Sequence, residues 1–106
     1  MPHDGLPTPF AELVLDLVET IPPGRVMAYS DIADALGRGG ARQVGQVMSR
    51  YGSGVPWWRV LRADGSCAPV QVAEQVERLR ADGTPFVGDR VDMSRARWRP
   101  RRSRRS

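Results

Sequence analysis

Near the start of this chain, apolar residues recur every three or four positions until a proline pair interrupts them. These residues are Phe10, Leu13, Val14, Leu17, Val18 and Ile21. The spacing places them on one face of an α-helix, with Thr8 as its N-cap and Pro9 in its first turn. Pro22-Pro23-Gly24 ends that helix. A chain of 106 residues with one long amphipathic helix is predicted to form one small packed domain.

Two shorter helices are predicted after this break. Residues 25–29 favour a short extended stretch, Ser30 is the predicted N-cap of a helix that runs to Leu36, and Gly37 suits its C-terminal cap. The next helix has an apolar row and, opposite it, a basic and hydrogen-bonding row. The apolar row is Ala41, Val44, Gly45 and Met48, and the polar row is Arg42, Gln46, Ser49 and Arg50. Two short helices joined by a glycine-containing turn behind a longer helix are typical of a helix-turn-helix.

The second half of the chain predicts short strands and one more helix. Residues 58–62 favour a strand that enters a tight turn at Asp64-Gly65, and such a hairpin would serve as a wing. Val72, Val76 and Leu79 mark a fourth helix that ends at Gly83, and a short extended segment follows near residues 87–93. The predicted fold is mainly α (α+β), a winged-helix-like DNA-binding domain with a helix-turn-helix and a short hairpin.

Positive charge is concentrated at the C-terminal end. The net charge is +4, and seven of the sixteen basic residues, all of them arginine, lie in residues 95–105. Residues 1–94 carry nine arginines against twelve acidic residues, a balance of −3. We therefore divide the chain into a domain, residues 1–94, and an arginine-rich tail, residues 95–106, that is too charged to pack. The expected partner of the tail is a polyanion, and the alternative is a tail that only aids solubility.

The composition excludes several classes of chemistry. The chain has one cysteine, Cys67, and one histidine, His3. These two residues are too few for a disulfide framework or a zinc cluster, and no second histidine is present to form a Cys/His or Ser/His catalytic pair if His3 does not. The glycines near residue 39 lack both a dinucleotide spacing and a phosphate-loop lysine. We expect no metal and no cofactor. The chain also has no long apolar run and no leader pattern, so a cytoplasmic protein without a membrane partner is expected.

Three short runs together resemble a known family. They are Arg25-Val26-Met27-Ala28-Tyr29-Ser30-Asp31-Ile32-Ala33, Ala41-Arg42-Gln43-Val44-Gly45 and Pro56-Trp57-Trp58-Arg59-Val60. In this order they are similar to the C-terminal domain of the O6-alkylguanine-DNA alkyltransferases. The third run in those enzymes is Pro-Cys-His-Arg-Val, and its cysteine accepts the alkyl group. Here Trp57 stands at the cysteine position, and an indole cannot replace a thiolate nucleophile. The chain thus resembles the non-enzymatic alkyltransferase-like proteins.

The resemblance also implies roles for single residues. Tyr29 matches the tyrosine that rotates the nucleotide, Arg42 matches the arginine that fills the gap left by a flipped base, and Arg59 matches a framework residue of the pocket. Trp57 and Trp58 are expected to form the base pocket with Tyr29, and Arg59 is expected to be a lesion-binding residue as well. Trp58 replaces a histidine and would narrow the pocket. The remaining expected DNA contacts are Ser30, Gln46, Arg50 and Arg62. Trp98-Arg99-Pro100 is similar to a basic, tryptophan-containing segment of the non-enzymatic branch.

The resemblance therefore implies a monomeric DNA damage sensor. It would bind duplex DNA, flip O6-alkylguanine into the pocket and mark the lesion for nucleotide excision repair proteins. Two alternatives remain. The same helix-turn-helix would suit a transcriptional regulator or a general DNA-binding protein without lesion selectivity, although no dimerisation element is evident. An alkyltransferase that works through Cys67 is the enzymatic alternative.

Overall fold

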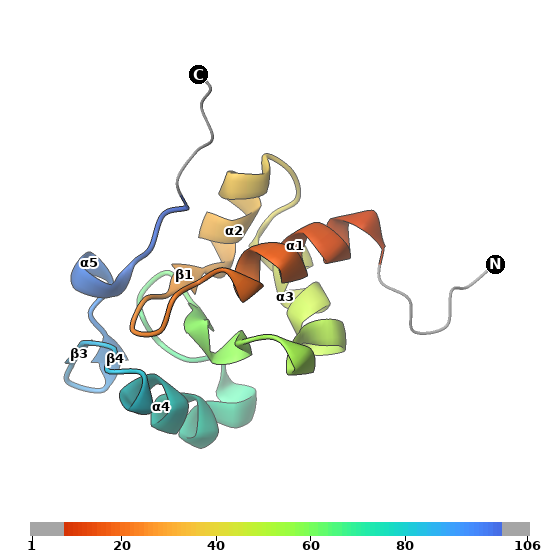
Figure 1. Ribbon diagram of the computed structural model, residues 1–106. Coiled ribbons are helices and arrows are strands. Elements are labelled where there is room, and N and C mark those ends of the chain that lie inside the picture. Colours follow the sequence, from red (N-terminus) through yellow and green to blue (C-terminus); the bar gives the residue numbers. More distant parts are fainter. Residues whose placement is uncertain (1–7, 101–106) are drawn as a thin grey trace.

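The computed structural model describes residues 8–100, with the side chain of Val70 left out, and its first helix begins where the sequence predicts (Figure 1). Helix α1 spans Pro9–Glu19, and its N-cap Thr8 accepts a hydrogen bond from the backbone N–H of Ala11 at 3.1 Å. The apolar stripe is buried at Val14 and Val18, which are fully inaccessible to solvent. A cap and a continuous apolar face are both local properties, which is why the sequence predicts this helix well.

Helix α2, Tyr29–Leu36, begins earlier than predicted. Its N-cap is Ala28, and the carboxylate of Asp31 accepts a hydrogen bond from the Ala28 N–H at 3.0 Å. The prediction of Ser30 as N-cap is wrong. The helix begins earlier because the Asp31 carboxylate pairs with the otherwise free backbone N–H of Ala28, two residues before Ser30. Tyr29 consequently becomes the first residue of the helix. Gly37 ends α2 in the left-handed conformation, at φ 70°, as the sequence predicts.

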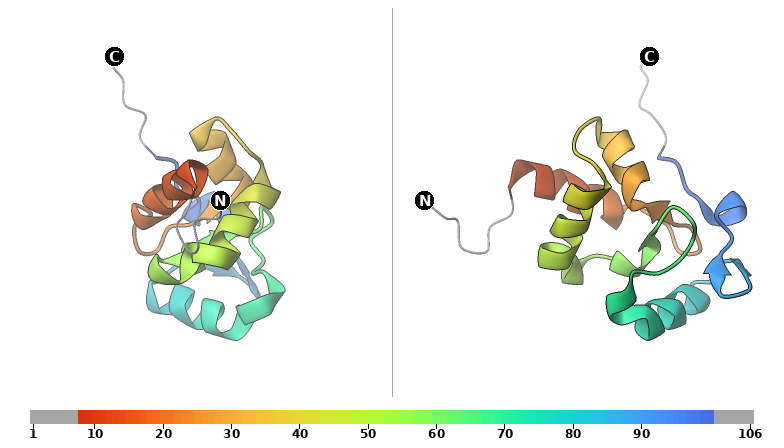
Figure 2. Two further views of the ribbon diagram at one scale, coloured as in Figure 1. Left: turned by 90° about the vertical axis from the view of Figure 1, so that its right-hand side faces the viewer. Right: turned by 180° about the vertical axis from the view of Figure 1, so that it is seen from behind.

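Helix α3, Ala41–Tyr51, packs against α1 and α2 (Figure 2). Gln43 caps its start, because the side-chain carbonyl accepts a hydrogen bond from the Gly40 N–H at 3.0 Å. The buried row of α3 is Val44 and Val47, whereas Ala41 is exposed. The predicted apolar row is therefore wrong at Ala41, because the core shared with α1 and α2 buries Val44 and Val47, whereas Met48 is only partly buried against it.

Two very short strands connect this helical unit to the rest of the molecule. Strand β1, Met27–Ala28, pairs in parallel with β2, Val60–Leu61, and the register places Met27 opposite Val60 and Ala28 opposite Leu61. All four residues are buried. Two 3₁₀ turns, Gly52–Gly54 and Trp57–Arg59, lie between α3 and β2. Residues 58 and 59 are thus helical rather than extended, which corrects the predicted strand over residues 58–62.

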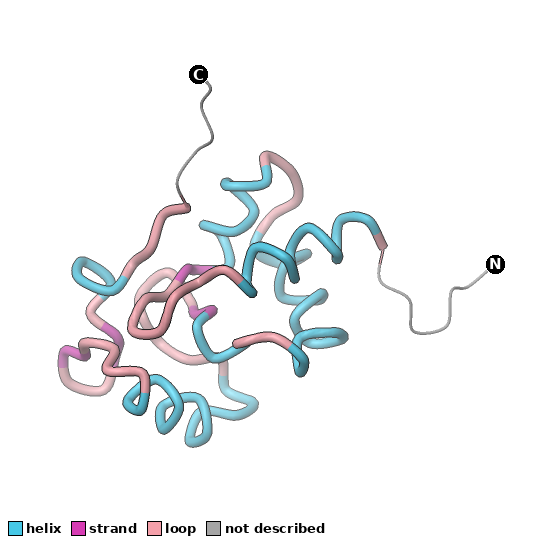
Figure 3. Tube along the Cα trace, viewed as in Figure 1, coloured by secondary structure: helices cyan, strands magenta, loops and turns pink. Residues whose placement is uncertain are grey.

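The predicted wing is also corrected. The turn at Asp64-Gly65 is present, since Gly65 has φ 86° and donates to the Arg62 carbonyl at 2.9 Å. The strand before this turn, β2, does not form a hairpin with the chain that follows it. It pairs in parallel with β1, because that pairing buries Val60 and Leu61. The antiparallel hairpin lies later in the chain, between β3, Phe86–Val87, and β4, Arg90–Val91 (Figure 3).

Helix α4, Val72–Ala81, follows a 3₁₀ turn over Pro69–Gln71 and precedes the hairpin. Helix α5, Met93–Ala96, comes after it. A second core lies between these elements and β2. Its buried residues are Val26, Leu61, Leu79, Val91 and Ala96. The fold is mostly helical with small sheets, which confirms the predicted fold class. Within residues 8–100, no helix is long and apolar enough to cross a membrane.

The C-terminal segment packs further than its charge predicts. Val26 donates to the Ala96 carbonyl at 2.9 Å, and the Trp98 N–H donates to the Val26 carbonyl at 2.7 Å. Arg97 forms an ion pair with Asp31 at 2.9 Å. The prediction that residues from 95 onward do not pack is therefore wrong up to Trp98, because backbone pairing with residue 26 and burial of Ala96 outweigh the charge. Residues 101–106 lie outside the described part of the chain.

Candidate nucleic-acid interface

A pocket of about 690 Å³ lies where α2, α3, the 3₁₀ turns and the start of α4 meet. It is lined by Tyr29, Ala41, Arg42, Gly45, Met48, Ser49, Gly52, Ser53, Trp57, Arg62, Ala68, Gln71 and Gln75. The structure thus brings together four of the predicted site residues, Tyr29, Arg42, Trp57 and Arg62, from four separate segments. Aromatic and small residues form its walls, with a few polar groups, which is the usual composition of a small-molecule or base pocket.

Tyr29 and Trp57 each stand at the first position of a helical turn. Tyr29 follows β1 and opens α2, and Trp57 follows Pro56 and opens the second 3₁₀ turn. Burial raises the pKa of the Tyr29 hydroxyl above its ordinary value, and the nearby positive charge of Arg62 opposes part of that rise. At neutral pH the phenol is therefore protonated and can donate a hydrogen bond inside the pocket.

Helix α3 presents a basic, polar face beside the mouth of the pocket. Arg42, Gln46, Ser49 and Arg50 are all exposed, as the sequence predicts for this row. With Gly45 they line a second, shallow hollow of about 860 Å³. Arg42, Gly45 and Ser49 line both the hollow and the pocket. The basic face of α3 and the pocket therefore adjoin each other at these three residues.

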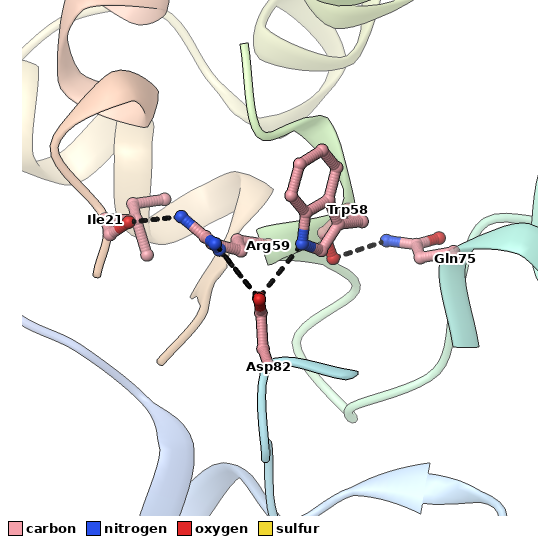
Figure 4. A network of polar contacts seen from close by, with 5 residues as sticks. All are labelled: Ile21, Trp58, Arg59, Gln75 and Asp82. Atoms are coloured by element: carbon pink, nitrogen blue, oxygen red, sulfur yellow. Dashed lines mark hydrogen bonds and ion pairs between the residues drawn. The ribbon is translucent and has the colours of Figure 1, made fainter. Parts of the chain in front are cut away.

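Trp58 and Arg59 do not line the pocket. They belong to a network of polar contacts centred on Asp82 (Figure 4). The Trp58 indole N–H donates to Asp82 at 2.9 Å, and Arg59 Nε donates to the same carboxylate oxygen at 2.8 Å. Arg59 Nη1 also donates to the Ile21 carbonyl at 3.0 Å. This corrects the expectation that Trp58 forms and narrows the base pocket, because its indole points to Asp82. Arg59, which is also expected among the lesion-binding residues, lies off the pocket lining and binds Asp82.

Asp82 is a structurally important residue that the sequence analysis missed. Burial works against its charged form, but hydrogen bonds from Arg59 and Trp58 outweigh it and hold the pKa of Asp82 below the ordinary value. Both side chains of the Arg59–Asp82 pair are only 13% exposed. The guanidinium groups of Arg59 and Arg78 also lie over the Trp58 ring, at 5.1 and 4.8 Å from its centre. No sequence signal pointed to Asp82, which is 24 residues from Trp58.

Gln75 was missed as well, although it carried a signal. It is a polar residue inside the apolar face of α4 and is only 3% exposed. Its amide group donates to the carbonyls of Trp58, at 3.0 Å, and Val60, at 2.9 Å. These bonds fix the chain that runs from the pocket into β2, and Gln75 also lines the pocket. A buried polar side chain must find partners, so its place in the stripe was the available clue.

Two other predicted residues lie off the pocket lining. Ser30 is half-buried in the first turn of α2. Cys67 is half-buried and packs against the second core, and burial raises the pKa of its thiol. A nucleophilic cysteine needs a lowered pKa, so the environment of Cys67 is the opposite of an activated one.

Comparison with known proteins identifies the family. Residues 9–84 match the family described as 6-O-methylguanine DNA methyltransferase, DNA binding domain. The chain belongs to this family. Alkyltransferase-like protein 1 of Schizosaccharomyces pombe is 31% identical over 103 residues, which cover 86% of this chain and 95% of that protein. A DNA base-flipping protein of Vibrio parahaemolyticus is 30% identical over 98 residues, which cover 86% of this chain and 97% of that protein.

Other members of the family differ in length or are known with bound DNA. A bifunctional methyltransferase/endonuclease of Picrophilus torridus is 36% identical over 87 residues, and the match covers 77% of this chain but only 29% of that protein. A crystal structure of S. pombe Atl1 in complex with damaged DNA containing O6-carboxymethylguanine superposes with a TM-score of 0.74 at 29% identity. That match covers 94% of this chain and all of the other.

Proposed function

We propose that this chain is a non-enzymatic sensor that binds duplex DNA, flips O6-alkylguanine into the pocket and holds it there. The observation that carries the proposal is the pocket itself. Tyr29 and Trp57 form aromatic walls, Arg42 stands at the mouth, and no thiol or carboxylate is found among its described lining residues. Such a pocket can stack and hydrogen-bond a base, but its described lining offers neither a thiolate nor a carboxylate to accept an alkyl group.

Binding would begin with the phosphate backbone. The exposed arginines of α3 neutralise phosphates without reading sequence, so this step would weaken as salt rises. Extrusion of a base then costs a few kcal/mol of stacking and pairing. Arg42 would offset part of that cost by stacking its planar guanidinium in the vacated position. Tyr29, held at the start of α2, would contact the rotated nucleotide.

Selectivity would follow from the base pair and from the pocket. Alkylation of O6 weakens pairing with cytosine, so the modified base costs less to extrude than guanine. The pocket would then retain the extruded base by stacking on Trp57 and by a hydrogen bond from the Tyr29 hydroxyl. Transfer of the alkyl group to a thiol would be disfavoured, because burial raises the pKa of Cys67 and this residue does not line the pocket.

The names and bound DNA of the similar proteins support this proposal. One is named a DNA base-flipping protein, another an alkyltransferase-like protein, and S. pombe Atl1 has been crystallised with damaged DNA. We further propose that the complex acts as a monomer and marks the lesion for nucleotide excision repair proteins. This hand-over rests on the resemblance to the alkyltransferase-like proteins alone.

The test is a pair of dissociation constants, measured at one stated salt concentration, for two duplexes that differ only in O6-methylguanine or guanine. Tighter binding of the lesion, together with no methyl transfer from a labelled duplex, is the expected result. Transfer that disappears in Cys67→Ser would instead establish the enzyme. Equal affinity for both duplexes would leave a general DNA-binding domain or a regulator, which a preference for one unmodified sequence would then identify.

A further inference from the structure

The pocket carries positive charge without a matching acid. Two arginines, Arg42 and Arg62, line it, and none of its described lining residues is aspartate or glutamate. A neutral aromatic base needs no such charge for stacking. Because Arg42 is already assigned to the vacated base position, the second positive charge, that of Arg62, is available to bind an anionic group.

Arg62 reaches the pocket through the pairing of β1 and β2. Because the strands run in parallel and Ala28 lies opposite Leu61, Tyr29 and Arg62 leave the same end of the pair as neighbours. Their closeness is also evident in the electrostatics, since the positive charge of Arg62 acts on the Tyr29 hydroxyl. Arg62 thus stands beside the residue expected to contact the flipped nucleotide.

The backbone of Arg62 is held firmly. Its N–H donates to the Ser66 carbonyl at 3.1 Å, and its carbonyl accepts from Gly65 at 2.9 Å. Gly65 is in turn fixed to β4, because the Val91 N–H donates to the Gly65 carbonyl at 3.0 Å. A side chain at position 65 would meet the Val91 carbonyl, so the turn and the strand fit closely.

The guanidinium of Arg62 is available for a ligand. Arg59 and Arg97 use theirs on Asp82 and Asp31 within the protein. For Arg62, by contrast, the described part of the chain provides no side-chain hydrogen bond or ion pair. An arginine fixed at its backbone, open at its head and facing a pocket is suited to a planar anion such as a carboxylate, which it can bind through two parallel hydrogen bonds.

We infer that the pocket selects O6-substituents that carry a negative charge, and that Arg62 binds the carboxylate of an adduct such as O6-carboxymethylguanine. This inference rests on the proposed function of the same pocket. The anion could also be a DNA phosphate, which is the other use of an exposed arginine. Charge on the adduct separates the two, because a phosphate contact is the same for every lesion.

The experiment compares four duplexes that differ only at one base: guanine, O6-methylguanine, O6-carbamoylmethylguanine and O6-carboxymethylguanine. The last two adducts have nearly the same size and shape and differ in charge. Since Arg62 is exposed, we expect the carboxymethyl duplex to bind the wild-type protein about fivefold more tightly than the carbamoylmethyl duplex. Titrations at one salt concentration measure the ratio.

Variants at Arg62, with one control at Arg50, test whether Arg62 causes the preference for the carboxymethyl adduct. Arg62→Gln is expected to bring the carboxymethyl-to-carbamoylmethyl ratio close to one, and Arg62→Lys to retain part of it. Arg50→Gln is the matched control, because Arg50 is an exposed arginine that does not line the pocket. It should weaken all four complexes alike and leave the ratio unchanged. Thermal melting of each variant checks that the domain still folds.

The outcomes are distinguishable. If the wild-type protein binds both isosteric adducts equally, or if Arg62→Gln weakens all four complexes by one factor, the inference is overturned, while a preference for O6-methylguanine over guanine keeps the proposed function. If guanine and O6-methylguanine bind equally, the proposed function fails and the inference fails with it. A ratio lost only in Arg62→Gln supports both.

Discussion

At the scale of single residues, Trp57 and Trp58 show how two identical neighbours take separate roles. Both lie in one 3₁₀ turn, in which successive side chains point about 120° apart. Their rings meet edge to face, with centres 6.0 Å apart. Trp57 consequently lines the pocket, whereas Trp58 reaches down to Asp82. The backbone conformation of three residues thus decides which indole lines the pocket and which binds Asp82.

Arg42 and Arg50 provide a test of base flipping at this scale. Both are exposed on α3 and line the outer hollow, but only Arg42 also lines the pocket. Arg42→Ala should lower affinity for an O6-methylguanine duplex about fivefold more than for normal DNA, because only the flipped state needs the vacancy filled. Arg50→Ala should weaken both complexes equally. Fluorescence anisotropy titrations measure these ratios, and equal losses in Arg42→Ala would remove its assigned role.

At the scale of elements, α4 is attached to the first helical unit by polar contacts made under the pocket. Asp82, just past the end of α4, accepts hydrogen bonds from Trp58 and Arg59, and Arg59 also binds the carbonyl of Ile21 after α1. Gln75, inside α4, binds the chain that enters β2. These contacts hold α4 against the turn Trp57–Arg59 and the start of β2, and both Gln75 and Trp57 line the pocket.

Asp82→Asn tests this attachment. Loss of the charge in a largely buried pair should lower the free energy of unfolding by about 3 kcal/mol at neutral pH. Because the pKa of Asp82 is lowered in the folded protein, its contribution is present above pH 4 and is lost as the pH falls further. Urea unfolding from pH 7 to pH 2 should therefore show a steeper loss for the wild type than for the variant.

Glu77→Gln is the control for this measurement, since Glu77 is exposed on the same helix. It should leave the unfolding free energy within about 0.5 kcal/mol of the wild type. Parallel acid profiles for the wild type and Asp82→Asn would show that the pair contributes nothing to folding stability.

At the scale of the whole molecule, the C-terminal segment joins the two cores. Val26 pairs with Arg97 as an isolated bridge, and Trp98 packs against the core formed by α1, α2 and α3. Arg25 adds two hydrogen bonds, to the carbonyls of Ala96 and Arg97. The Asp31 carboxylate accepts hydrogen bonds from the backbone N–H of Ala28 and from Nε of Arg97. The same carboxylate therefore caps α2 and fixes the C-terminal segment. The position of Tyr29 at the start of α2 therefore depends on residues nearly seventy positions away.

Two truncations separate packing from charge. Removal of residues 101–106 takes away four arginines and should weaken binding to lesion and normal DNA alike, with a flatter dependence on salt. Removal of residues 95–106 should also destabilise the fold by several kcal/mol, because Ala96 and Trp98 leave their cores. Salt titrations and urea unfolding measure the two effects. An unchanged salt slope after the shorter truncation would mean that the tail does not contact phosphate.

Local sequence patterns sufficed for the existence of helices α1 to α4, for the Thr8 and Gly37 caps, for the exposed face of α3 and for the concentration of arginine at the C-terminal end. The short runs that carry the resemblance also singled out Tyr29, Arg42 and Trp57, which the structure brings to one pocket. Helical periodicity and capping involve residues three or four positions apart, so the chain carries them in its linear order.

The long-range contacts could not be obtained in that way. The parallel pairing of β1 with β2, the partner of Trp58, the burial of Gln75 and the packing of Trp98 each join segments that are far apart in the chain. A strand of two residues has too short a pattern of alternating side chains to indicate which strand it pairs with. A carboxylate such as Asp82 has the same neighbours in the sequence whether its side chain is solvated or paired. Burial of the two cores decides which of these segments meet, because it is a property of the assembled elements rather than of any one of them.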